Sequence, residues 1–108
     1  MRYAKTPPIA QVAKLCAAIK RDTDFNDPDL VDPYDDFGEG VIEITIGADP
    51  DGGWSYQTGD NSFTGGAYGF PYWGTGYILA DTNCRDLARD LVDQIKDGMA
   101  GAGLNVRY

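Results

Sequence analysis

The side chains that most often carry out catalysis are scarce in this chain of 108 residues, because it contains no histidine. A Ser-His-Asp triad, a Cys-His dyad and any zinc site with a histidine ligand are therefore excluded. The sequence also lacks a P-loop lysine signature and a GxGxxG motif that follows a strand and opens a helix. These absences predict a protein that is not an enzyme and that needs no cofactor.

One acidic run has the beginning of a calcium-binding loop, Asp22-x-Asp24-x-Asn26. An EF-hand loop requires a glycine at its sixth position and a bidentate glutamate at its twelfth. Here these positions hold Asp27 and Pro33. The sequence therefore predicts no metal site, although weak cation binding by this acidic run or by the Asp49-Pro50-Asp51-Gly52 stretch stays open.

The two cysteines, Cys16 and Cys84, fall on the apolar faces of two expected helices. A free thiol on such a face behaves as a small hydrophobic group. The spacing excludes a CxxC redox or zinc motif. We expect two reduced core cysteines, and a disulfide that joins the two helices is the alternative.

Residues 59–76 form an aromatic–glycine segment, in which six of 18 residues are glycine. Tyrosine and tryptophan dominate the energetic centres of protein interfaces. This composition predicts a protein-binding surface, and the alternative is that half of the rings face the core. The aromatic candidates for this surface are Phe63, Tyr68, Phe70, Tyr72 and Trp73.

Trp54 and Asp60 complete the candidate surface and also suggest a second function. An acid beside aromatic rings suits a sugar, so a small-ligand or carbohydrate-binding module is the alternative to a protein-binding one. No second carboxylate stands out for the pair that glycoside hydrolysis requires.

Charge is distributed unevenly along the chain, whose net charge is −8. From Asp22 to Cys84 there are 13 acidic residues and no lysine or arginine. This distribution predicts no direct binding to nucleic acid and no attraction to an anionic membrane. It favours docking on a basic protein, with Asp32, Asp35 and Asp36 of the acidic loop 22–40 steering the approach. The alternative for this loop is a solvated segment that promotes solubility.

Hydrophobic periodicity predicts two helices and several short strands. The first helix is expected over 7–21, with Thr6 as N-cap and Pro7 in its first position. The second is expected to begin after a cap at Thr82 or Asn83 and to stop at Gly98. The expected strands are 41–47, 54–58, 77–80 and an edge strand in 104–108, with a less regular one near 68–73 and a turn at 49–53.

This order of elements predicts an α+β fold, with an antiparallel sheet of three to five strands and both helices packed on one face. We expect a single domain over 1–108 and, without an apolar run or signal sequence, a cytoplasmic location. The tail strand leaves a homodimer open through strand addition.

Two stretches resemble small uncharacterised proteins encoded by phages and bacterial genomes. They are Trp54-Ser-Tyr-Gln-Thr58-Gly-Asp60-Asn-Ser62-Phe-Thr-Gly-Gly66-Ala-Tyr68-Gly and Asn83-Cys84-Arg85-Asp-Leu-Ala-Arg-Asp90. The resemblance implies a mobile-element origin and, by association, a protein that binds and inhibits a host protein. No residue role is attached to it.

Overall fold

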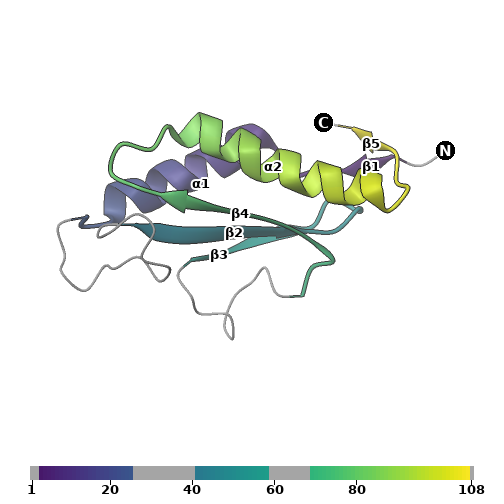
Figure 1. Ribbon diagram of the computed structural model, residues 1–108, viewed down its shortest axis with the longest axis horizontal. Coiled ribbons are helices and arrows are strands. Elements are labelled where there is room, and N and C mark those ends of the chain that lie inside the picture. The colour runs from purple at the N-terminus through teal and green to yellow at the C-terminus, as the bar shows by residue number, and fades with distance from the viewer. Residues whose placement is uncertain (1–2, 26–40, 59–68, 108) are drawn as a thin grey trace.

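The computed structural model describes residues 3–25, 41–58 and 69–107. A three-stranded antiparallel sheet with strand order β3-β2-β4 lies beside two helices, and two short strands pair separately. Figure 1 shows α1 and α2 side by side above this sheet. The α+β class is confirmed. In chain order the elements are β1 (Ala4–Lys5), α1 (Ile9–Asp22), β2 (Ile42–Ala48), β3 (Trp54–Thr58), β4 (Tyr72–Ile78), α2 (Cys84–Gly101) and β5 (Val106–Arg107).

Helix α1 begins two residues later than the sequence predicted. Pro8 is extended, with φ −64° and ψ 125°, and its carbonyl accepts the amides of Gln11 and Val12 at 3.0 Å each. A proline disfavours the helical conformation of the residue before it, so Pro8 keeps Pro7 out of the helix. The expected cap at Thr6 was therefore wrong.

Helix α2 begins as predicted and ends later. The Asn83 side chain accepts the amides of Arg85 and Asp86, both at 3.1 Å, which satisfies two of the donors left open at a helix start. Gly98 does not stop the helix, which continues to Gly101. The reason is Met99, which is completely buried and extends the apolar stripe by one more turn.

The β2–β3 hairpin turns at an aspartate. Oδ1 of Asp49 accepts the amides of Asp51 and Gly53 at 2.9 and 3.0 Å. A Cβ at Gly53 would lie 2.6 Å from Oδ2 of Asp49, so a larger residue there would have to displace this carboxylate. The turn predicted at 49–53 is therefore confirmed.

Strand β4 is longer than either strand predicted for this part of the chain, since it joins residues from both into one element. Its glycines allow α2 to lie directly on it. A Cβ on Gly74 would overlap the carbonyl oxygen of Leu91, and one on Gly76 would lie 2.7 Å from Cδ1 of Leu87. The glycines that made this segment look irregular are therefore what allows the helix to pack there.

The core lies between the sheet and the helices. Helix α2 packs against β4 and β2, and α1 packs chiefly against α2. For α1, packing on the sheet therefore stays a prediction. The completely buried side chains include Val12 and Cys16 from α1, Ile44 and Ile46 from β2, Ile78 from β4, and Leu91, Val92, Ile95 and Met99 from α2.

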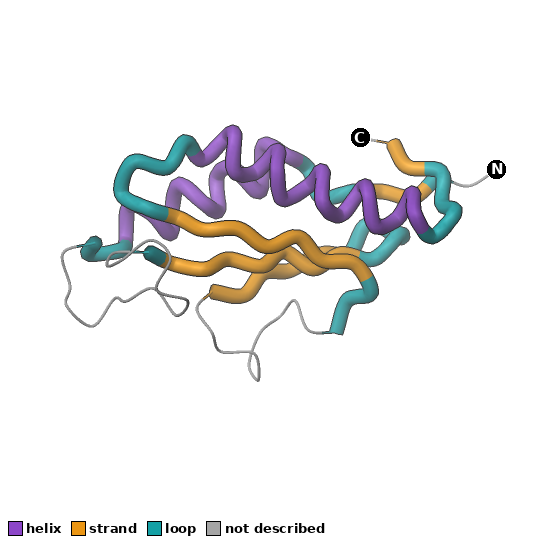
Figure 2. The backbone as a smooth tube through the Cα atoms, viewed as in Figure 1, coloured by secondary structure: helices purple, strands orange, loops and turns teal. Residues whose placement is uncertain are grey.

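The chain's tail is not an edge strand of the main sheet. β5 pairs in parallel with β1, a strand that the sequence analysis did not predict, and the two lie apart from the three-stranded sheet (Figure 2). Two residues per strand are too few to show a period in the sequence. Within the described ranges, no helix is long and apolar enough to cross a membrane.

Candidate functional site

The structure describes four of the predicted site residues: Trp54, Phe70, Tyr72 and Trp73. The other six, Asp32, Asp35, Asp36, Asp60, Phe63 and Tyr68, lie outside the described residues. Phe70 is half-buried in the approach to β4. The described candidates therefore belong to two strands and their flanks.

Two of these rings belong to the core side of the sheet. Trp54 and Tyr72 both stand opposite Ala48, one on each neighbouring strand, so the three side chains share a face. That face is the one on which α2 packs, and both rings contact the core while remaining half-buried. Tyr72 also lies against α2, since a Cβ on Gly98 would be 3.4 Å from its Cδ1.

Trp73 points to the opposite face, which we call the outer face. Successive residues of a strand alternate between faces, so Trp73 is directed away from Tyr72 and from the core. It is 53% exposed, and its neighbour across the sheet is Gly47, which has no side chain to cover it. The outer face further contains Glu43, Thr45, Ser55, Gln57, Thr75 and Tyr77.

The other side chains of the outer face are mostly polar. The hydroxyls of Thr45 and Thr75, directly opposite each other, lie 3.1 Å apart. Glu43 stands opposite Tyr77, and no described residue donates a hydrogen bond to its buried Oε2. A buried carboxylate oxygen without a donor is costly, so a cation or N–H group that reached it would be bound favourably.

The sheet contains no basic residue. All nine lysines and arginines lie outside β2, β3 and β4, and six of them are in the two helices: Lys14, Lys20, Arg21, Arg85, Arg89 and Lys96. The acidic residues of 22–40 precede β2 in the sequence. The charge imbalance found along the sequence is therefore also a difference between the sheet and the helices.

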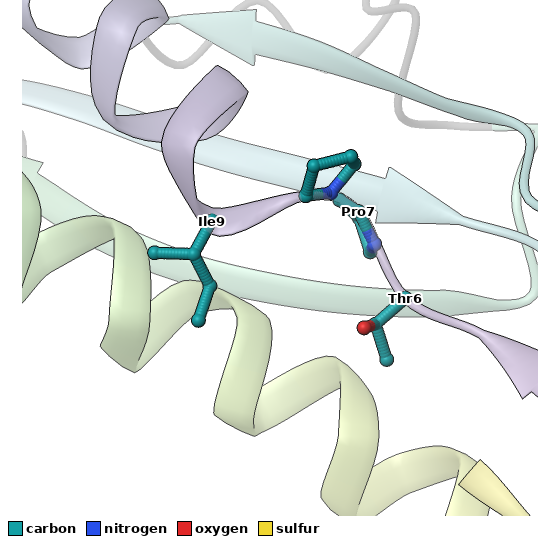
Figure 3. A pocket seen from close by; sticks show the side chains of 4 residues that line it. Thr6, Pro7 and Ile9 are labelled. Carbon is teal, nitrogen blue, oxygen red and sulfur yellow. The ribbon is translucent and has the colours of Figure 1, made fainter. Parts of the chain in front are cut away.

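A small depression lies far from these residues in the sequence. It has a volume of about 200 Å³ and is lined by Thr6, Pro7, Pro8 and Ile9. Figure 3 shows Thr6 and Ile9 extending to the side of the chain on which α2 lies. Pockets for small molecules usually measure at least about 300 Å³ and offer convergent polar groups. This depression contains none of the predicted site residues.

The two cysteines are free thiols. Cys16 is completely buried and Cys84 is half-buried against the core. Burial, and to a smaller extent the neighbouring Cys84, raises the pKa of Cys16 to about 11. A thiol that stays protonated is a poor nucleophile. Among residues 3–25, 41–58 and 69–107, no three acidic or cysteine side chains come together as metal ligands.

The outer-face residues other than Trp73 were missed by the sequence analysis. The alternation in 41–47 separates Glu43 from the isoleucines, but nothing in the sequence shows that Tyr77 pairs with it, because register depends on tertiary packing. No protein-family model, curated protein or solved structure matches this chain. The site is therefore interpreted from its own geometry.

Proposed function

We propose that this chain is a non-catalytic binding protein that docks on a basic protein through the outer face of its sheet, with Trp73 as the anchor. The observation that carries the proposal is the 53% exposure of Trp73 at a position opposite Gly47. A large ring on a rigid strand contributes much contact area and loses little conformational entropy on binding.

Charge supports a basic partner. The chain carries a net charge of −8, and its sheet contains no lysine or arginine that would repel a cationic surface. On the same face as Trp73, Glu43 offers a buried oxygen to which no described residue donates. In this proposal Asp32, Asp35 and Asp36 speed the encounter through long-range attraction, which salt screens.

Two further expectations belong to the same proposal. The resemblance to phage and bacterial proteins supports an inhibitor encoded by a mobile element. A cytoplasmic location would bring such an inhibitor together with a host protein that binds nucleic acid through a basic surface.

The test is affinity capture from host lysate with three baits: the unchanged protein, Trp73→Ala and Tyr3→Ala. Tyr3 is a matched control because it is 47% exposed and lies outside the three-stranded sheet. Capture is repeated at about 0.1 M and about 1 M salt, between which the Debye length falls from about 10 to about 3 Å.

We expect one basic protein to be retained at low salt by the unchanged protein and by Tyr3→Ala. It should be lost with Trp73→Ala and at high salt. Retention by Trp73→Ala, or capture that salt does not weaken, would contradict the proposal. A glycan retained on an array by the unchanged protein, with no protein captured, would favour the carbohydrate-binding alternative.

A further inference from the structure

The two edges of the main sheet differ in how their backbone groups are satisfied. On the β4 edge, the backbone N–H of Thr75 donates to Oε1 of Gln94 at 3.0 Å, and the Thr75 carbonyl accepts a hydrogen bond from Nε2 of Gln94 at 2.9 Å. A side chain of α2 thus occupies this edge as a neighbouring strand would. β3 forms the other edge, because among the described strands it pairs with β2 alone.

The direction of each backbone group on β3 follows from this contact. Thr75 directs its N–H and C=O away from β2, so it and Thr45 form a non-hydrogen-bonded pair. Thr45 must then bond to Gln57 on the other side. The Asp49 amide also donates to the Gly53 carbonyl at 2.9 Å, so the hydrogen bonds between β2 and β3 join odd-numbered residues of the two strands.

The even-numbered residues of β3 therefore direct their N–H and C=O groups outward, away from the sheet. These residues are Trp54, Tyr56 and Thr58. Within the described ranges, no residue donates to or accepts from their outward groups. Among the described residues, three donors and three acceptors in a row on this edge therefore have no partner.

The five residues of this strand also lack the sequence features that normally prevent edge-to-edge pairing. Natural sheets protect exposed edges with charged residues, prolines or bulges. The strand Trp54–Thr58 has no charge and no proline, and its five residues pair with β2 without interruption. Tyr56, at its centre, is 44% exposed.

We propose that β3 pairs with β3 of a second copy of this chain, in antiparallel orientation about a two-fold axis at Tyr56. In this register Tyr56 faces its own copy and Trp54 faces Thr58, so three pairs of residues exchange two hydrogen bonds each, six in all. The two sheets become one six-stranded sheet, with α2 of both copies on the same face. The exposed tyrosine rings meet at the axis.

A second copy fits this edge better than another partner for two reasons. The outward groups are symmetric about Tyr56, so the strand is complementary to itself without any change of register. Copies that each carry a charge of −8 repel one another, and this strand is a place where they can approach without facing charges. Salt screens the remaining repulsion, so the dimer should become tighter as salt rises.

The experiment is sedimentation of the full chain over a range of concentrations at low and high salt. We expect a reversible dimer that is favoured by high salt. Among the backbone groups, Tyr56→Pro removes just the outward N–H, which the hydrogen bonds between β3 and β2 do not use. It should weaken dimerisation about tenfold or more. Tyr56→Ala, which keeps the N–H, is the matched control and should dimerise more tightly than Tyr56→Pro.

A charge-complementation pair tests the register even if the proline variant fails to fold. Tyr56→Lys and Tyr56→Glu should each be monomeric, since like charges would stand directly opposite at the axis. An equimolar mixture of the two should form a heterodimer. A monomeric unchanged protein at every concentration and salt, full dimerisation of Tyr56→Lys, or a mixture that stays monomeric would overturn the proposal.

This inference is independent of the proposed function. Trp73→Ala should leave the dimer intact, because Trp73 lies on β4 and on the outer face. The two associations also respond to salt in opposite directions. A dimer of the unchanged protein that captures no basic partner would therefore refute the proposed function alone.

Discussion

Gln94 on α2 pairs with the main chain of Thr75 on β4 through both ends of its side-chain amide, at 3.0 and 2.9 Å. Asp90 sets the orientation of that amide, since its Oδ2 accepts Nε2 of Gln94 at 3.1 Å. A helix side chain thus satisfies the backbone of an edge strand at its midpoint. The contact attaches α2 to the sheet and occupies the edge-facing backbone groups of Thr75.

Gln94→Glu should destabilise the fold by about 1–2 kcal/mol near neutral pH. The new carboxylate cannot donate to the Thr75 carbonyl, and it would stand beside the like charge of Asp90 four residues earlier. Urea unfolding at pH 7 measures the loss. Gln11→Glu, an exposed position on α1, is the matched control and should change the free energy of unfolding by less than about 0.5 kcal/mol. Equal effects of the two substitutions would contradict the role of Gln94.

Gly74→Ala should destabilise the protein by about 3 kcal/mol or more, whereas Gly76→Ala should cost about 1–2 kcal/mol. The difference lies in what the new methyl group meets. At Gly74 it overlaps the backbone of Leu91, and at Gly76 it meets the ends of leucine side chains that can rotate. Thermal unfolding of the two variants under the same conditions provides the comparison. A smaller loss for Gly74→Ala would show that α2 can move away from β4.

Gly98→Ala should stabilise the protein by about 0.5–1 kcal/mol. Gly98 lies inside α2, is exposed, and has space for a methyl group at an ordinary contact distance of 3.4 Å from the Tyr72 ring. Glycine in a helix interior loses more backbone entropy on folding than alanine does. Chemical denaturation measures the gain, and Gly101→Ala at the helix end is the control, with a smaller expected effect. A destabilised Gly98→Ala would mean that the Tyr72 ring cannot accept the contact.

The sequence predicted most of the fold because its elements carry strong local signals. The apolar stripe of α2, its Asn83 cap and the alternation of β2 are all periodic over many residues. The continuity of β4 was not predictable, since Gly74 and Gly76 weaken a strand pattern and are explained only by the backbone of α2 above them. The β1–β5 pair joins residues from opposite ends of the chain, which a local pattern cannot show.

The candidate site was less predictable than the fold. Composition identified the rings of residues 54–73, but it could not assign Trp54 and Tyr72 to the core side and Trp73 to the outer face. That assignment depends on whether the even-numbered or the odd-numbered side chains of β4 face α2, and therefore on the register of β4 with β2. Substituting Tyr72 and Trp73 together would thus combine a core change with a surface change, so the two are better tested separately.

The stability of the protein should fall as pH rises from about 9 to about 11, through Cys16. Burial raises the pKa of this thiol from 9.0 to about 11, so in this range the unfolded chain loses a proton that the folded chain keeps. Stability from this group is fully present below pH 9 and is lost as pH approaches the folded value. The loss should reach about 2 kcal/mol by pH 11. Urea unfolding from pH 8 to pH 11 measures this loss, and Cys16→Ala is the control because it keeps every other ionisable group of the chain. The variant should be less stable at pH 8 but show a shallower decline, and parallel curves would mean that Cys16 ionises as readily in the folded chain as in the unfolded one.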